Sequence, residues 1–387
     1  MKNLYKLTNK IKYYEWGSSG ILPEFLNCEN KKGLPFAELW MGTHKSGSSQ
    51  IQDCDDGNGA LKDLSEVSGD IPFLLKLLAV DKPLSIQAHP NKTQAEEGFE
   101  KEEKSGLTIT SPKRNYKDDN HKPEVLCALT PFTMMAGFRE PEKIIVSLEG
   151  LLISAPQLKD IISPLIKALE PGLLAAFFRT LINFSQYQQE YLRSFIKGSD
   201  INKSCGFISG DQWDLMKSFC DLYPNDPAIL SPLYLNFIRL NPGQAVYIPA
   251  GILHAYLSGF GVELMTNSDN VLRGGLTHKH VDIGELFNIL HFVPFIPQVI
   301  TPPESGSWHC YHTPCREFLL AYMFGSGDEM FPGKTPAICI VTEGELTADN
   351  EKFKKGDSFF IPKGKKLSFS GNYKLYAACT WSSENET

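Results

Sequence analysis

Two short segments of this chain share one pattern, and this repeat constrains the fold more than any other feature of the sequence. Residues 243–251 read G-x3-Y-I-P-x-G, and residues 356–364 read G-x3-F-I-P-x-G. Each gives a turn glycine, a short strand and a Pro-x-Gly exit, so two copies of one β-unit are predicted. The position three beyond the final glycine is His254 in the first copy and Leu367 in the second. Because the turn forms without a histidine, we expect His254 to serve local chemistry.

The rest of the chain divides into regions of different periodicity. Residues 141–224 follow a helical period. One apolar stripe in this block consists of Leu158, Ile161, Ile162, Leu165, Ile166 and Leu169. After residue 232, short runs rich in Val, Ile, Phe and Tyr alternate with turns, which is typical of a sandwich or barrel. The first 140 residues are mixed: a buried strand is predicted at 73–80, and the charged segment 98–106 favours a helix or an exposed loop.

Composition and charge exclude several classes of protein. At 387 residues the chain exceeds the usual size of one domain, so two or three domains are expected. A net charge of −7 argues against general binding to nucleic-acid phosphates, which requires a basic face. No signal peptide or membrane span is indicated by the apolar runs. The nine cysteines contain no CxxC pair, which suits a reducing compartment. We therefore expect a cytoplasmic protein that binds neither nucleic acid nor membrane.

Polar residues upstream of His254 have the spacing of metal ligands. Gln87 and His89 are separated by one residue, so on a strand both side chains leave the same face. Glu124 follows Pro123, which restricts the local backbone. Together with His254 these residues offer an amide oxygen, two imidazoles and a carboxylate. That set suits Zn²⁺ and leaves it able to accept a water or substrate oxygen.

A second cluster is a rival metal site. His309, Cys310, His312 and Cys315 lie within seven residues. Their spacing differs from that of zinc fingers and ribbons, and consecutive strand positions would send His309 and Cys310 to opposite faces. The sequence also lacks a complete dinucleotide fingerprint, a phosphate-binding P-loop and a nucleophile elbow. Nucleotide-dependent chemistry is not indicated.

Six motifs in order resemble type I mannose-6-phosphate isomerases. They are AELWMGTH at 37–44, FLLKLL at 73–78, SIQAHPNK at 85–92, HKPE at 121–124, YIPAGILHAY at 247–256 and NSDNVLRGGLTHKHVD at 267–282. The resemblance implies a mainly β fold of cupin (jelly-roll) barrels: a catalytic barrel with a helical insertion domain, and a second, metal-free C-terminal barrel. The domains implied are 1–140 and 227–300 for the catalytic barrel, 141–226 for the insertion and 301–387 for the second barrel. Leu367, where the first copy has a histidine, agrees with a metal-free second barrel.

The resemblance also implies the activity, which is zinc-dependent interconversion of mannose 6-phosphate and fructose 6-phosphate with one Zn²⁺ per chain. The implied metal ligands are Gln87, His89, Glu124 and His254, and the implied catalytic residues are Arg273 and Lys122. The implied substrate-binding residues are Lys76, Ser85, Tyr256, Glu263, Asp269 and Lys279. The expected partner is a small sugar phosphate, and the expected state is a monomer or a weak homo-oligomer.

The chemistry of these residue types fits such a reaction. Moving a carbonyl between C1 and C2 requires a base that removes a carbon-bound proton and a cation that stabilises the enediolate. Arg273 offers a permanent charge, and Gly274 and Gly275 would let a ligand approach the backbone. Lys122, two residues before Glu124, could neutralise phosphate or carry a proton. The base stays open between Glu263, Asp269, Lys122 and an imidazole.

Two other functions are compatible with part of the pattern. A barrel with histidine and carboxylate ligands could bind iron and act as an oxygenase. A non-catalytic sensor could retain the fold and bind a sugar phosphate without turnover. The additional ligand Gln87 and the pocket lysines favour an enzyme that acts on a phosphosugar over an oxygenase. The complete ligand set, together with Arg273, argues against a non-catalytic sensor.

Overall fold

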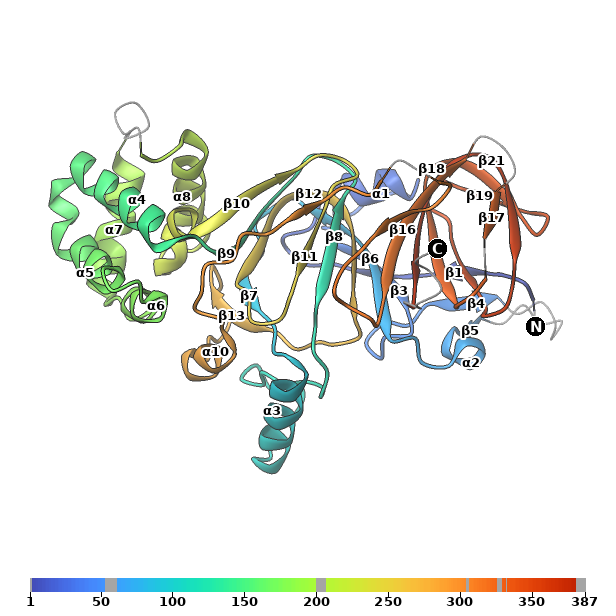
Figure 1. Cartoon of the computed structure of the whole chain (residues 1–387), viewed down its shortest axis with the longest axis horizontal. Coiled ribbons are helices and arrows are strands. Elements are labelled where there is room, and N and C mark those ends of the chain that lie inside the picture. Colours follow the sequence, from blue (N-terminus) through green and yellow to red (C-terminus); the bar gives the residue numbers. More distant parts are fainter. Residues whose placement is uncertain are drawn as a thin grey trace.

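The computed structural model describes residues 2–52, 61–199, 207–303, 306–325, 329–331 and 333–380. The molecule is elongated, with a helical bundle at one end, a β-structure in the middle and a second β-structure at the other end (Figure 1). The described strands form two large sheets, which we call the central sheet and the C-terminal sheet. The predicted mainly β fold with a helical insertion is confirmed.

The central sheet contains the motifs that carry the predicted site. Its strands are β2 (Lys10–Lys12), β3 (Glu38–Gly42), β6 (Phe73–Val80), β7 (Ile86–Ala88), β8 (Glu124–Ala128), β9 (Phe132–Phe138), β10 (Leu235–Leu240), β11 (Ala245–Ile248), β12 (His254–Thr266), β13 (Leu272–Gly275) and β14 (Val299–Ile300). The fully buried β6 confirms the strand predicted at 73–80. Strand β12 pairs first with β7 and β9, and beyond Gly259 with β6 and β8. His254 lies before this change of partners, and Glu263 lies after it.

The C-terminal sheet combines strands from both ends of the chain. Its strands are β1 (Tyr5–Thr8), β4 (Gln50–Gln52), β5 (Leu61–Asp63), β15 (His309–Tyr311), β16 (Leu319–Gly325), β17 (Glu329–Phe331), β18 (Ala337–Ala348), β19 (Glu351–Lys354), β20 (Ser358–Ile361) and β21 (Leu367–Cys379). Strand β1 pairs antiparallel with β20 and with β4. The first 63 residues therefore contribute strands to both sheets.

The repeated sequence pattern forms the same local structure twice. The strands β11 and β20 lie at equivalent positions of the two copies, and β12 and β21 begin three residues after the second glycine of each. The glycines that flank β11 have φ of 86° and 76°, and those that flank β20 have φ of 90° and 84°. Residues with a Cβ rarely adopt these angles. The prediction of two copies of one β-unit is confirmed.

The predicted helical block is also confirmed. It contains α4 (Pro141–Ser154), α5 (Lys159–Leu169), α6 (Leu174–Ile182), α7 (Gln186–Gly198) and α8 (Gly210–Leu222), and the short α9 (Ser231–Tyr234) follows it. Phe178 of α6 packs against Phe138 of β9, with ring centroids 5.6 Å apart. The same apolar core includes Leu253 and Leu272, which adjoin predicted site residues. The insertion is thus packed against the strands that carry the site.

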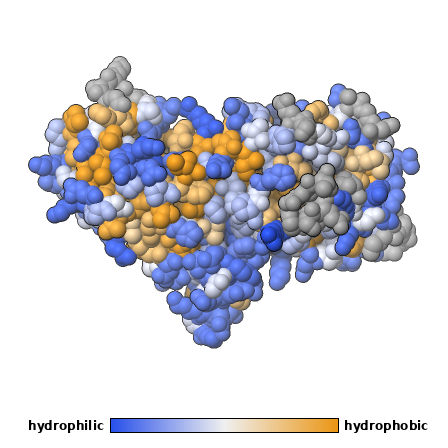
Figure 2. Space-filling view, viewed as in Figure 1, coloured by the Kyte–Doolittle hydropathy of each residue, from blue (hydrophilic) through white to orange (hydrophobic). Residues whose placement is uncertain are grey.

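Helix α3 (Lys92–Lys104) confirms that the charged segment 98–106 is largely helical. It projects from the central part of the molecule, and its surface is hydrophilic (Figures 1 and 2). The helix is tied to the loop that follows it, because the Glu102 carboxylate accepts hydrogen bonds from the backbone N–H groups of Asn115 and Tyr116. The remaining helices are α1 (Ile21–Phe25), α2 (Ser65–Ser68) and α10 (Ile283–Ile289). In the described part of the chain, every helix is too short or too polar to traverse a bilayer.

Two glycine substitutions in helices are expected to have opposite effects on stability. Gly98→Ala should lower the free energy of unfolding by about 1–3 kcal/mol, because the added Cβ would lie 2.4 Å from the buried ring of Tyr116. Gly198→Ala, where no heavy atom lies within 4 Å of the added Cβ, should raise it by about 0.5–1 kcal/mol. Urea unfolding of both variants measures the two changes. Equal stabilisation by both substitutions would show that Tyr116 does not restrict α3.

Candidate metal centre and adjoining cavity

Three buried side chains of the central sheet form a metal-binding group. They are His89, Glu124 and His254, whose ligand atoms all lie within 4.8 Å of one another. Within the described ranges, no other group of three or more His, Cys, Asp or Glu residues could hold a metal ion in this way. The Nε2 atoms of His89 and His254 lie 3.2 and 3.3 Å from the Glu124 carboxylate. The Gln87 amide lies 3.4 Å from the Nε2 of His254. All four predicted ligands are therefore neighbours.

Strand register explains why residues so far apart in sequence meet. His254 at the start of β12 is directly opposite Gln87 on β7, and Met265 near its end is opposite Glu124 on β8. His89 follows β7 immediately. Since β12 bends between these two pairings, it brings β7 and β8 to the same point.

The surroundings of both histidines suit metal coordination. The Nδ1 of His89 lies 2.7 Å from the carbonyl oxygen of Asn270, and that of His254 lies 3.0 Å from the carbonyl oxygen of Ile252. A carbonyl only accepts, so each imidazole carries its proton on Nδ1 and presents the lone pair of Nε2. The Nε2 of His89 is buried and makes no hydrogen bond. A bound cation would satisfy this atom, and two imidazoles with a carboxylate and an amide fit zinc.

The charges of the cluster are also those that a metal requires. Burial, and after it the positive charge of Lys122, lowers the pKa of His89 to about 4. Burial alone would raise the pKa of the Glu124 carboxyl, but Lys122 Nζ, 2.9 Å away, and the imidazoles hold it well below its ordinary value. At neutral pH the cluster therefore contains a neutral His89 and an ionised Glu124, the forms that bind a cation.

A cavity of about 760 Å³ opens above this cluster. Among its lining residues are the sequence-predicted Lys76, Ser85, Gln87, Lys122, Glu124, Tyr256, Glu263, Asp269, Arg273 and Lys279. His89 and His254 lie below it, in contact with Glu124. The Tyr256 hydroxyl donates a hydrogen bond of 3.0 Å to Glu124, and its pKa is well above the ordinary value because of burial and the nearby carboxylates. The structure thus brings all the residues carried over from the motifs to one place.

The floor of the cavity contains a buried ion pair. Glu263 on β12 is directly opposite Lys76 on β6, and their charged atoms lie 2.9 Å apart. Burial alone would lower the pKa of Lys76, but the carboxylates, with Glu263 first among them, raise it above its ordinary value. The pair contributes no net charge to the cavity.

Removing one partner of this pair should be more damaging than removing both. Lys76→Met should lower the free energy of unfolding by about 3–5 kcal/mol because it leaves a buried charge unpaired, whereas Lys76→Met with Glu263→Leu should recover most of the loss. Urea unfolding of the metal-free proteins measures both. Lys352→Met, at an exposed pair with Glu345, should change stability by less than about 1 kcal/mol. Equal destabilisation by the single and double variants would contradict the coupling.

The rim of the cavity carries positive charges that lack acidic partners. None of the described carboxylates forms an ion pair with Arg273, Lys117 or Lys279. Burial, followed by repulsion from Arg273 and Lys117, lowers the pKa of Lys279. Burial also lowers the pKa of Arg273. Like charges gathered without counter-ions destabilise the free protein and are relieved by a bound anion.

Sequence reasoning missed several residues at this site. Lys117 stands beside two aspartates in NYKDDN, where it has the appearance of a solvated surface charge, and only its position five residues before Lys122 pointed to the site. Trp40 also lines the cavity and donates a 2.5 Å hydrogen bond from Nε1 to Glu38. Its motif, AELWMGTH, gives no role to the tryptophan. Tyr223 lines the cavity from the end of the helical insertion, and no sequence signal indicated it.

The rival metal cluster does not assemble. His309, Cys310, His312 and Cys315 are all described, and they do not form a group with metal-ligand distances. The ring of His309 stacks on Tyr322 with centroids 4.6 Å apart. The Cys315 thiol lies 3.2 Å from a Glu317 oxygen. The prediction that β15 sends His309 and Cys310 to opposite faces agrees with their different burial.

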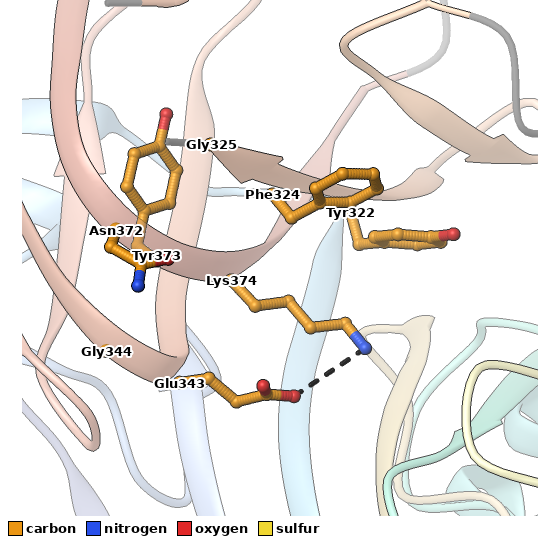
Figure 3. Close-up of a pocket in the computed structure, with 8 residues that line it drawn as sticks. All are labelled: Tyr322, Phe324, Gly325, Glu343, Gly344, Asn372, Tyr373 and Lys374. Atoms are coloured by element: carbon orange, nitrogen blue, oxygen red, sulfur yellow. Dashed lines mark ion pairs between the residues drawn. The ribbon is translucent and has the colours of Figure 1, made fainter. Parts of the chain in front are cut away.

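A second hollow of about 480 Å³ lies on the C-terminal sheet (Figure 3). The rings of Tyr322 and Phe324 lie on one side of it, and the charged atoms of Lys374 and Glu343 form a pair 3.7 Å apart. Its described charges therefore neutralise each other, and its lining offers no metal ligands of the kind found at His89. The cavity above the metal-binding group is therefore the candidate functional site.

Comparisons with known proteins point to the same place. Residues 4–141 match the family model for the catalytic domain of type I phosphomannose isomerase. The mannose-6-phosphate isomerase of Escherichia coli K12 is 34% identical over 378 residues, covering 92% of this chain and 94% of that protein. The corresponding protein of Salmonella typhimurium is 35% identical with the same coverage.

Solved structures are equally similar. A crystal structure of zinc-bound mannose 6-phosphate isomerase has a TM-score of 0.87 and 32% identity, covering 98% of this chain and all of that one. The Salmonella typhimurium protein bound to its substrate and to zinc has a TM-score of 0.86 with the same identity and coverage. The likeness extends over nearly the whole chain.

Proposed function

Because the chain belongs to the type I mannose-6-phosphate isomerase family, we propose that it interconverts mannose 6-phosphate and fructose 6-phosphate with one zinc ion per chain. The zinc ligands proposed are Gln87, His89, Glu124 and His254. The observation that carries the proposal is the buried His89–Glu124–His254 group beneath a cavity whose rim cations lack acidic partners. A sugar phosphate matches this site, because its phosphate can bind the rim cations while its neutral ring lies near the metal-binding group. The cupin-type fold agrees with the proposed function.

The phosphate is recognised by the cations of the rim. Lys117 and Lys279 are exposed, line the cavity and have no described acidic partner. A phosphate dianion would relieve their mutual repulsion, which fits the direction of the Lys279 pKa. Ser85 and Tyr256 also line the cavity, and the Tyr256 hydroxyl donates a hydrogen bond to Glu124. The reacting end of the sugar would then lie beside Glu124.

The chain's own groups account for the isomerisation. Zinc, when bound, acts as a Lewis acid that polarises a substrate oxygen. Arg273, the cation whose backbone pairs with that of Gln87, stabilises the negative charge that develops on the enediolate. Lys122, 2.9 Å from Glu124, holds that carboxylate and contributes a second positive charge near the reacting carbons.

Proton transfer between C1 and C2 requires a group that faces the cavity. Burial, and after it the charge of Glu124, raises the pKa of Glu263 against the opposing effect of Lys76. A raised pKa brings a carboxyl closer to neutral pH, where a proton carrier works best. Asp269 also lines the cavity, and His44 and Ser46 lie within 3.6 and 3.2 Å of its carboxylate. The raised pKa of Glu263 favours it as the base.

We propose that the chain is divided into the domains that the sequence motifs imply. Residues 1–140 and 227–300 form the catalytic barrel, residues 141–226 the helical insertion, and residues 301–387 a metal-free barrel. The helices from Pro141 to Leu222 support the insertion. Strands β1, β4 and β5 lie in the C-terminal sheet, so the division follows chain order rather than sheet membership. We further propose a cytoplasmic monomer or weak homo-oligomer, which sedimentation of the zinc-loaded protein would test.

The activity is tested by assaying conversion of mannose 6-phosphate before chelation, after chelation and after zinc is restored. Turnover that is lost and then rescued supports the proposal. A zinc-loaded protein that binds the sugar phosphate without converting it would instead be a sensor. Bound iron that absorbs visible light, with oxygen consumption, would point to an oxygenase.

A further inference from the structure

The segment that ends the helical insertion contacts two loops that line the cavity. The Tyr223 hydroxyl donates a 3.2 Å hydrogen bond to the carbonyl oxygen of Pro83, in the loop before β7. The Tyr223 ring also lies 5.4 Å from that of His278, which lines the cavity as well. Three residues later, Asp226 contacts Thr277, the neighbour of His278. The insertion is therefore joined to the site at its rim.

Asp226 binds backbone groups from two segments. One carboxylate oxygen accepts a 2.9 Å hydrogen bond from the N–H of Ala228, and the other accepts a 3.2 Å bond from the N–H of Thr277. Burial raises the pKa of Asp226, while the N–H groups of Ala228, Thr277 and Leu276 act in the opposite direction. These contacts stabilise a turn that starts just after β13.

The turn itself adopts an unusual backbone conformation. Leu276 is fully buried with φ of 50°, and Gly275 has φ of 138°. A Cβ on Gly275 would lie 2.3 Å from the Cβ of Ala228, so the segment that directly follows the insertion approaches this backbone as closely as glycine allows. A strained segment of this kind persists only where its surroundings hold it. Asp226 and Ala228 are the residues that contact the turn from the end of the insertion and the segment after it.

Arg273 lies directly before this turn. Its strand pairs with β7, and the register shifts between Arg273 and Gly275. The side chain lines the cavity without an ion pair to any described residue. No side-chain partner therefore fixes the guanidinium, and its direction depends on the backbone on either side of it.

We propose that Asp226 is a positioning residue for the isomerisation: it holds the Leu276–Thr277 turn and thereby aims Arg273 at the substrate. The helical insertion then has a role in catalysis, because its last residues orient a cation of the site. The inference rests on the proposed function for its kinetic consequences. The contact between Asp226 and the turn does not depend on that function.

The test compares single and double variants of the zinc-loaded full-length protein. Asp226→Ala should reduce kcat by about 10- to 100-fold with a smaller change in KM, because a displacement of about 1 Å can cost that much. In an Arg273→Ala background the same change should cause little further loss, since the two residues act through one another. Asp226→Asn, which keeps one accepting oxygen, should retain more activity. Asp221→Ala, at an exposed acid of α8 paired with Lys197, should match wild type.

Two kinetic results would overturn the proposal: a wild-type kcat in Asp226→Ala, or losses that multiply in the double variant. If Asp226→Ala does not fold, Asp226→Asn and Asp226→Ser carry the same comparison. Amide hydrogen exchange at residues 274–279 gives an answer independent of turnover. Exchange there should rise in Asp226→Ala and stay unchanged in Asp221→Ala, and unchanged exchange in both would refute the contact. If the wild-type protein shows no turnover, only the proposed function is refuted. The hydrogen-exchange experiment would still test the contact between Asp226 and the turn.

Discussion

Arg273→Ala is expected to reduce kcat by about 100- to 1,000-fold while leaving the fold and the bound zinc unchanged. The residue offers the only rim guanidinium among the described lining residues, and it has no acidic partner that its loss would expose. Removing a preorganised donor that stabilises developing negative charge typically costs this much. Steady-state kinetics with mannose 6-phosphate, together with zinc content, measure the effect.

Two further variants make this prediction specific. Arg273→Lys keeps the charge but loses the planar fork, so it should recover only part of the lost rate. Arg239→Ala removes an arginine that pairs with Asp211 away from the cavity, and it should match wild type. Wild-type kcat in Arg273→Ala would remove this residue from the chemistry, and a rise in KM alone would make it a phosphate-binding group.

His254→Ala is expected to abolish tight zinc binding and with it turnover. Replacing a group that merely orients a ligand costs about 10- to 100-fold in metal affinity, so loss of a direct ligand should cost more. Gln87, His89 and Glu124 would remain, but only one imidazole would be left and the ion would lose a buried ligand, so its binding should weaken sharply. Zinc per chain after dialysis measures the binding. Added zinc should raise the Tm of wild type and leave that of the variant unchanged.

The matched control for this variant is His312→Ala. His312 belongs to the rival cluster, is exposed and is absent from the metal-binding group. We expect it to retain zinc and activity. The opposite pattern, with zinc lost in His312→Ala and kept in His254→Ala, would move the metal to the C-terminal sheet.

Much of the site could be predicted because its residues stand in local motifs. Gln87 and His89 lie two positions apart at a strand, and His254 follows a Pro-x-Gly turn whose second copy has Leu367 instead. Such patterns encode local geometry, which depends on neighbours in sequence. The helical stripe of residues 158–169 was predicted for the same reason, since its buried face follows from spacing alone.

Other parts of the site depend on contacts between distant segments. Lys117 has no motif of its own, and it joins the rim only because its loop is fastened to α3 and to Asn270. Asp226 looks like an ordinary residue of a turn until β13 is packed against it. The sequence does not indicate which residues surround Arg273, and in the structure no described acid forms an ion pair with it.

The sequence by itself determined the repeated β-unit, the helical block and the residue types of the metal ligands, because turns, periodicity and donor atoms are properties of short segments. Only the tertiary structure decided that β1 completes the C-terminal sheet, that β12 bends to join Gln87 with Glu124, and that the insertion reaches back to the Arg273 turn. These are long-range pairings whose choice depends on burying apolar faces and satisfying backbone hydrogen bonds across the whole chain. No single segment carries that information.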